Sequence, residues 1–241
     1  MRDHGDPMSG IAWFVGNILP YITWSIFFIA LLYNFLKWFF IPRPIVWAIF
    51  PARYNTLSIY ANIVKRIFTL PGPLFVDKVI FVLALLFHFG LIISLSLHAK
   101  YIFTPNLPIE YLLGTAAGIA AAIGSFGFVI RRMTLKEKAV STPEDYFSLI
   151  LLILTLSLGC YLRILNLVDH EAMWSWVIGV LTLRPVDPPA NPIFIVHILL
   201  AQIYIAYLPF KTLMHPIGIF FGQKVILDGR HIHKTKEGDQ A

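Results

Sequence analysis

The chain has little charge and almost no cysteine. Only 13% of its 241 residues are Asp, Glu, Lys or Arg, which is about half the share found in soluble globular proteins. With 58% apolar residues and a mean hydropathy of +0.74, this composition excludes a soluble domain. A single cysteine, Cys160, excludes an intrachain disulfide and an iron–sulfur cluster held by this chain alone. Any iron–sulfur chemistry must therefore belong to a partner.

Several other features are missing. We detect no internal repeat, no low-complexity tract and no basic cluster that would indicate nucleic-acid binding. The N-terminal stretch MRDHGDPMSG is acidic as well as basic, and the apolar run behind it is too long for the core of a cleavable signal. We therefore expect the first apolar segment to stay in the protein as a helix.

What the chain does contain is five apolar segments long enough to cross about 30 Å of hydrocarbon at about 1.5 Å per residue. Prolines cluster between them, and each cluster favours the end of a helix at the membrane edge. We predict an all-α fold in which residues 1–241 form a single membrane domain, an integral bundle of five transmembrane helices. The segments cover about residues 11–36, 79–99, 110–130, 146–168 and 192–214.

The distribution of Lys and Arg predicts the orientation of these helices. Fifteen of the 19 Lys and Arg residues fall in the 37–78 connection, in the 131–145 connection or at the C-terminal end of the chain from Lys211 onward. The opposite side holds only Arg2, Lys100, Arg163 and Arg184. We therefore predict an outer N-terminus and a cytoplasmic C-terminus, and we attribute the net charge of +6 to this topology.

Two segments outside the spans have their own patterns. Residues 55–70 place apolar side chains at helical spacing with Lys65 and Arg66 opposite, which predicts an amphipathic helix on the cytoplasmic interface. Residues 170–183 carry Trp174 and Trp176 on the outer side, where an aromatic belt is expected. Surface anchoring is the favoured interpretation for both, and docking of a partner subunit is the alternative.

The third segment is rich in small residues. Gly114-x-x-x-Gly118 forms a face that lets helices approach closely. Ordinary helix packing is the favoured interpretation. The alternative is that the missing side chains leave room for a porphyrin plane.

Four of the eight histidines lie within or at the ends of two apolar segments. His88 and His98 lie in the second segment, and His197 and His215 lie in the fifth. An imidazole in hydrocarbon needs a partner, because an unpaired polar group there costs several kcal/mol. The two helices are antiparallel, so His98 should pair with His197 near the outer face and His88 with His215 near the cytoplasmic face. Two histidines on each of two helices is the arrangement that two bis-histidine b haems require.

The spacing of these histidines agrees only approximately. Ten residues on one helix span about 15 Å and eighteen on the other span about 27 Å. We expect tilt, side-chain reach and a distortion at Pro209, which lacks an N–H, to absorb the difference. A zinc site is disfavoured because two separate depths do not make one tetrahedral site. A haem-free structural anchor and a proton-coupled transporter with histidine relays remain the alternatives.

The spacings H-x9-H and H-x17-H are accompanied by LPYITWSIF near the start, LPIE at 107–110, GTAAGIAAAIG before Arg131 and Arg132, and PFKTLMH at 209–215. With these features the whole chain resembles the cytochrome b (gamma) subunit of respiratory nitrate reductase and its relatives in heterodisulfide-reductase-like and dissimilatory sulfite-reduction-associated membrane complexes. The stretch ILLAQIYIAYLPFKTLMH is more similar to the M subunit of the sulfite-reduction-associated complex than to the nitrate enzyme.

This resemblance implies two haem b groups with His88, His98, His197 and His215 as axial ligands. It also implies quinone or quinol chemistry near the outer haem and a cytoplasmic iron–sulfur partner subunit. Further membrane and outer-face subunits of a respiratory or sulfur-metabolism complex are expected, in the cytoplasmic (inner) membrane of a prokaryote. The chain would be the electron-transfer subunit of an oxidoreductase complex, and the direction of electron flow, the quinone type and the terminal acceptor are left open.

Charged residues near the two membrane faces supply the remaining candidates. Where the nitrate-type subunit has a lysine linked to quinol binding, this chain has Leu112. We therefore choose Lys100, Glu110 and Arg163 as quinone-site candidates, from charge and depth alone. Arg131 and Arg132 are candidate partners of the inner-haem propionates, although a role as topology-setting charges is favoured.

Overall fold

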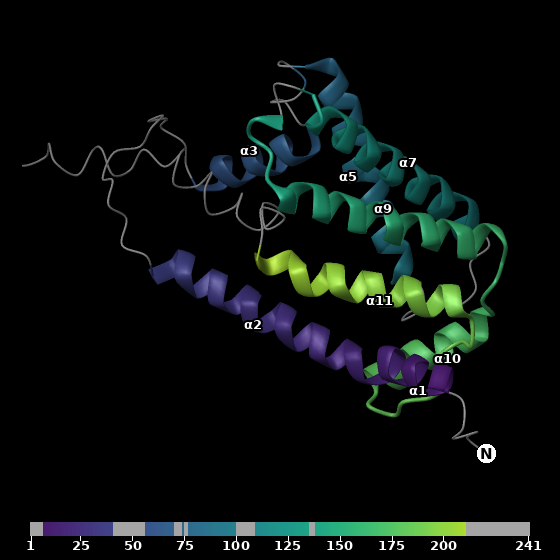
Figure 1. Ribbon diagram of the computed structural model, residues 1–241. Coiled ribbons are helices and arrows are strands. Elements are labelled where there is room, and N and C mark those ends of the chain that lie inside the picture. Colours follow the sequence, from purple (N-terminus) through teal and green to yellow (C-terminus); the bar gives the residue numbers. More distant parts are fainter. Residues whose placement is uncertain are drawn as a thin grey trace, which may run out of the picture. The chain divides into compact units, whose positions relative to one another are not determined.

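The computed structural model describes residues 7–40, 56–69, 74, 77–99, 109–134 and 138–210. In these ranges the chain is helical, with no strand. Five of the described helical segments are long and apolar enough to cross a membrane, which confirms the predicted spans and a multi-pass integral membrane protein (Figure 1). They are Gly10–Lys37, Lys78–His98, Tyr111–Arg132, Pro143–Ile164 and Pro192–Phe210.

The chain divides into two compact units, each described by itself. One comprises Met1–Ile26 with Pro73–Ala206, and the other comprises Phe27–Gly72 with Tyr207–Ala241. The prediction of a single membrane domain stays a prediction.

In the first unit, three long helices follow one another and pack in sequence order. They are α5 (Lys78–His98), α7 (Ile109–Arg132) and α9 (Pro143–Ile164), with α5 against α7 and α7 against α9 (Figure 1). A buried cluster of Phe87, Ala121, Leu152 and Leu156 joins all three helices, and Tyr204 of α11 (Pro192–Tyr207) packs against it.

Glycines of α7 set how closely these helices approach. A Cβ at Gly124 would lie 2.7 Å from the backbone nitrogen of Phe87, and a Cβ at Gly90 of α5 would lie 2.6 Å from the α7 backbone. Side chains of α9 cover the Gly114-x-x-x-Gly118 face, since Arg163 lies over Gly114 and Cys160 lies over Gly118. These glycines therefore serve ordinary helix packing, as the favoured interpretation has it.

The first span is interrupted, which the hydropathy pattern did not predict. It begins as α1 (Pro7–Trp13), continues as a π-helical turn, η1 (Phe14–Ile18), and then becomes α2 (Leu19–Phe40). Leu19 donates its N–H to the carbonyl of Phe14, five residues back. Hydropathy does not report how a span packs against other helices, and this packing determines the local widening.

The helix α9 begins and ends earlier than the predicted range 146–168. It begins at Pro143 because Thr142 and Asp145 form a capping box: the Thr142 N–H and hydroxyl donate to the Asp145 carboxylate at 2.9 and 3.1 Å. It ends at Ile164 because Asn166 adopts the left-handed conformation, with φ 49°. The Leu167 N–H then returns to the Leu162 carbonyl, so the predicted end at residue 168 was wrong.

The fifth span is distorted where a distortion was expected. The helix α11 ends at Tyr207 and is followed by a 3₁₀ turn, η2 (Leu208–Phe210), with Pro209 buried. The predicted continuation through residue 214 lies outside the described residues.

Two shorter helices complete the described chain. The predicted amphipathic segment is a helix, α3 (Thr56–Thr69), with Lys65 and Arg66 exposed, and its place at a membrane interface stays a prediction. The predicted outer segment is α10 (His170–Leu181), whose Trp176 packs against Phe194 of α11. Trp176 is thus a packing residue, while Trp174 is exposed.

Candidate functional site

The two histidines of α5 have the same local geometry. Nδ1 of His88 lies 2.8 Å from the carbonyl oxygen of Ala84, and Nδ1 of His98 lies 2.7 Å from that of Ser94. A carbonyl oxygen can only accept a hydrogen bond, so Nδ1 must carry the proton in each ring. The helix thereby fixes the tautomer, and Nε2 keeps its lone pair.

His197 of α11 reaches the same tautomer through a different helix. Its Nδ1 donates to the carbonyl oxygen of Thr155 on α9 at 3.0 Å. Gly159, one turn further along α9, leaves room for the ring, because a Cβ there would lie 2.9 Å from Cε1 of His197. Both the hydrogen bond and the close approach come from α9, so this helix positions the ring.

Both members of one of the two predicted histidine pairs are among the described residues. His98 and His197 lie close enough for their imidazoles to interact electrostatically. They come from α5 and α11, and their pairing around one haem stays a prediction. His215, the predicted partner of His88, lies outside the described residues.

The Nδ1 hydrogen bonds of these histidines meet a requirement of axial haem ligation. A metal-binding histidine usually donates its second ring nitrogen to a carbonyl or carboxylate, which orients the ring and raises the basicity of the binding nitrogen. His88, His98 and His197 all meet this condition with backbone carbonyls. Among the described residues no three His, Cys, Asp or Glu side chains gather around one metal ion, and pairs of imidazoles are what a haem iron takes.

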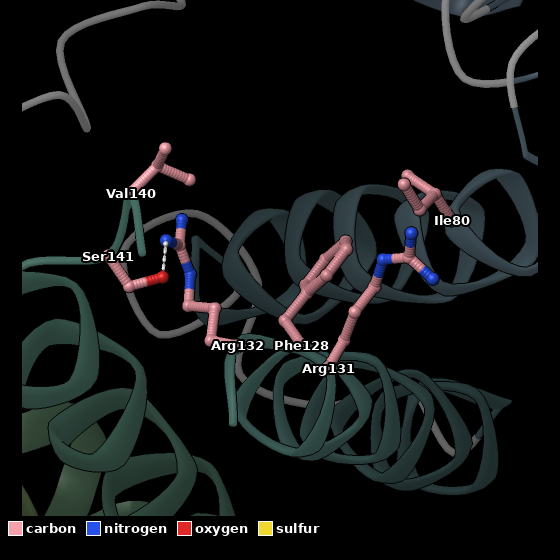
Figure 2. A pocket seen from close by; sticks show the side chains of 6 residues that line it. All are labelled: Ile80, Phe128, Arg131, Arg132, Val140 and Ser141. Atoms are coloured by element: carbon pink, nitrogen blue, oxygen red, sulfur yellow. Dashed lines mark hydrogen bonds between the residues drawn. The ribbon is translucent and has the colours of Figure 1, made fainter. Parts of the chain in front are cut away.

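The arginines at the C-terminal end of α7 are engaged in ion pairs. Arg131 lies 2.9 Å from the carboxylate of Asp77, and Arg132 lies 3.2 Å from that of Asp145. Arg132 also donates to the hydroxyl of Ser141 at 3.2 Å, as Figure 2 shows. The two pairs tie the end of α7 to the first residues of α5 and α9.

A small cavity of about 170 Å³ lies between these arginines. Its lining comprises Ile80, Phe128, Arg131, Arg132, Val140 and Ser141 (Figure 2).

Asp77 beside this cavity is the N-cap of α5. The N–H groups of Ile80 and Val79 donate to its carboxylate, and together with Arg131 they hold the pKa of Asp77 below its ordinary value of 3.8. The carboxylate is therefore ionised at neutral pH.

The three quinone-site candidates are only partly described. Lys100 lies outside the described residues, and of Glu110 only the backbone, at the start of α7, is described. Arg163 near the end of α9 is half-buried and lies over Gly114, beside Leu97. Leu97 immediately precedes His98, so Arg163 is the one candidate that the structure places near a candidate haem ligand.

Two further residues had no role in the sequence analysis. Asn17 in η1 and Gln202 in α11 are only 2% and 8% exposed. Nε2 of Gln202 donates to the carbonyl oxygen of Val15 at 2.9 Å. The available signal was Pro20, three residues after Asn17, because a proline inside a span leaves backbone carbonyls without an N–H partner.

Comparisons with known proteins give the relatives of this chain. The sequence model of the nitrate reductase gamma subunit family matches residues 66–223. The chain is 27% identical over 260 residues to a protein of Archaeoglobus fulgidus named Hdr-like menaquinol oxidoreductase cytochrome b-like subunit, covering 86% of this chain and 77% of that protein. A protein of the same name from Archaeoglobus profundus is 29% identical over 158 residues, covering 57% of this chain and 47% of that protein.

Proposed function

Because the chain belongs to the nitrate reductase gamma subunit family, we propose that it is a dihaem cytochrome b subunit. In this role it transfers electrons between a membrane quinone and a cytoplasmic iron–sulfur partner subunit. The observation that carries the proposal is that the three described span histidines all donate Nδ1–H to a backbone carbonyl, which makes Nε2 the basic nitrogen of each ring. The name of the Archaeoglobus relatives, a menaquinol oxidoreductase cytochrome b-like subunit, supports the quinol partner.

In the proposal His98 and His197 hold the outer haem, and His88 and His215 hold the inner one. A haem with two imidazole ligands has no open coordination position, so it supplies one-electron transfer rather than oxygen or substrate binding. The contribution of this chain is to fix the rings. The carbonyls of Ala84, Ser94 and Thr155 set the tautomer and orientation of His88, His98 and His197.

The orientation of the helices determines how electron transfer moves charge across the membrane. The charge asymmetry of the loops supports an outer N-terminus and a cytoplasmic C-terminus in the inner membrane of a prokaryote. A quinol oxidised near the outer face gives up two protons there and two electrons that cross inward. Each elementary charge moved against 100 mV is worth about 2.3 kcal/mol. The same path would serve quinone reduction if the electrons ran outward.

The charged residues take supporting roles in this proposal. Lys100, Glu110 and Arg163 stay the charged candidates at the outer quinone site, and Arg163 has the described position beside Leu97 in its favour. Arg131 and Arg132 already pair with Asp77 and Asp145. These pairs favour the topology role over contact with propionates.

Absorption spectroscopy of the purified chain tests the proposal. We expect a split or broad b-type α-band and about two haems per chain. His98→Ala or His197→Ala should remove the outer haem, and His88→Ala or His215→Ala the inner one. His170→Ala, at the start of α10, is the control and should keep both.

Two results would contradict the proposal. A folded, haem-free protein would leave only a structural anchor. Substrate-dependent proton flux without visible absorbance would indicate a transporter.

A further inference from the structure

Pro20 leaves two backbone carbonyls inside the membrane without their usual partner. It has no N–H to offer to the carbonyls four and five residues earlier, those of Gly16 and Val15. Side chains from two other helices supply the missing N–H donors. The indole N–H of Trp176 donates to the Gly16 carbonyl at 3.0 Å, and Nε2 of Gln202 donates to the Val15 carbonyl at 2.9 Å. Within the described chain, the π-helical turn is thus satisfied by α10 and α11.

Polar atoms of two side chains at this turn remain without a partner. Among the described residues, both amide atoms of Asn17, Nδ2 and Oδ1, have no hydrogen-bond partner, and neither has Oε1 of Gln202. These side chains are 2% and 8% exposed, so water outside the protein does not reach them. A buried amide without partners costs several kcal/mol in an apolar medium. Together they offer two N–H donors and two carbonyl acceptors.

The surroundings of this turn are apolar and aromatic. Val15, Phe194 and Ile198 form a buried cluster, with Trp176 packed against it. The rings of Trp176 and Phe194 meet edge to face, with centroids 5.4 Å apart. An apolar wall with a few fixed polar groups is the composition of a small-molecule site.

We propose that Asn17 and Gln202 bind the head group of the quinone and quinol. The inference rests on the proposed function and names a site for its substrate. A primary amide suits both oxidation states, because it can donate to a quinone carbonyl and accept from a quinol hydroxyl without changing its own charge. Gln202 follows His197 by five residues on α11, about 7.5 Å along the helix axis. Five residues also turn the helix by about 140°, so the head group would lie about one and a half turns from the histidine proposed to hold the outer haem and toward another side of α11.

This site differs from the charged candidates that the sequence suggested. Lys100, Glu110 and Arg163 were chosen for charge at the membrane edge, whereas Asn17 and Gln202 are uncharged and lie within the spans. A neutral quinone head group loses less by entering an apolar site that offers amides than by pairing with a desolvated charge.

Photolabelling tests the site on the intact chain in lipid vesicles. The probe is a photoactivatable naphthoquinone, and the labelled residues are found by mass spectrometry. We expect the label in residues 11–24 and 195–207, and excess menadione should displace it. Asn17→Leu, which keeps the branching of the side chain and removes the amide, should lower labelling about tenfold, the effect of one buried hydrogen bond of about 1.4 kcal/mol. Thr23→Val, at a buried polar residue of the same span, is the control and should label as the parent does.

The haem spectrum, recorded on the same samples, keeps the two proposals apart. Absent haem absorbance with the label still on residues 11–24 refutes the haem assignment and supports the site. Label concentrated at Lys100, Glu110 or Arg163 overturns the site while leaving the haem assignment intact. Labelling that Asn17→Leu leaves unchanged also overturns it, and would mean that Asn17 holds only water. Because the label map of the parent chain decides between these positions, the test does not depend on the folding of any variant.

Discussion

Gly159→Ala tests whether α9 positions the ring of His197. An added Cβ would lie 2.9 Å from Cε1, 3.5 Å from Nδ1 and 3.6 Å from Nε2 of His197. Carbon atoms in good contact are about 3.5–4.0 Å apart, so the ring has to move by about half an ångström or more. Thr155 lies one turn before Gly159 on the same face of α9, so this movement also strains the 3.0 Å hydrogen bond from Nδ1 to the Thr155 carbonyl.

Overpacking of this size costs about 1–3 kcal/mol, and the imidazole bears much of it because the α9 backbone is fixed. If His197 is an axial ligand, the outer haem should show weakened or altered ligation while the inner haem stays unchanged. Electron paramagnetic resonance of the oxidised protein resolves the two low-spin signals, and the haem-to-protein ratio reports on occupancy. We expect a shifted outer signal and a ratio that falls from about two toward one.

Gly10→Ala provides the matched control. It adds the same methyl group to an apolar span, at a position where nothing lies within 4 Å of the new Cβ. Both signals should match the parent protein. If Gly159→Ala also leaves the two signals and the haem ratio unchanged, the ring of His197 is not constrained by α9 and the reasoning for the outer site fails.

Three further predictions concern stability, each measured by unfolding in detergent. Trp176→Phe removes the donor to a buried carbonyl and should cost about 1–3 kcal/mol, whereas Trp174→Phe, on the exposed side of the same helix, should cost less than about 0.5 kcal/mol. Asp77→Asn should abolish an acid-sensitive part of the stability. Because the folded pKa of Asp77 is lowered, its contribution to stability is complete above pH 3.8 and disappears as the pH falls through the lowered value. A parent protein with the same acid dependence as the variant would contradict this. Gly124→Ala should separate α5 from α7 and lower stability, because its Cβ would lie 2.7 Å from a backbone nitrogen. Gly127→Ala should lower stability less, because its Cβ meets only a leucine side chain that can rotate. Equal losses of stability would show that the close approach at Gly124 is not what holds α5 and α7 together.

Much of the fold follows from local pattern. The five spans depend on continuous apolar composition, and the observed helices lie within a few residues of the predicted ranges. Local chemistry also explains where α9 starts, since Thr142 and Asp145 form a capping box that the sequence contains. The end of α9 could have been predicted from Asn166, because asparagine is among the few residues that tolerate a left-handed helix stop. The predicted range extended past Asn166 because the residues on both sides of it are apolar.

The candidate site was predictable only in part. The sequence indicates which histidines lie in spans and which helices run antiparallel, and these two facts predict the pairing of His98 with His197. It does not indicate that Thr155 receives the Nδ1 hydrogen bond of His197, because the two residues are 42 positions apart. Nor does it indicate that Asn17 is buried, since helical periodicity within an all-apolar span does not tell which face meets protein and which meets lipid.

The sequence by itself determined that this is a membrane protein of five helices with histidines at two depths, because hydrocarbon imposes length, apolarity and pairing on any chain that crosses it. Only the tertiary structure decided which groups donate hydrogen bonds to the carbonyls of the π-helical turn in the first span. Pro20 creates the need for outside donors, but Trp176 and Gln202, more than 150 residues away, supply them. Hydrogen bonds between distant helices depend on how the helices pack, and packing is a property of the whole bundle rather than of any one segment.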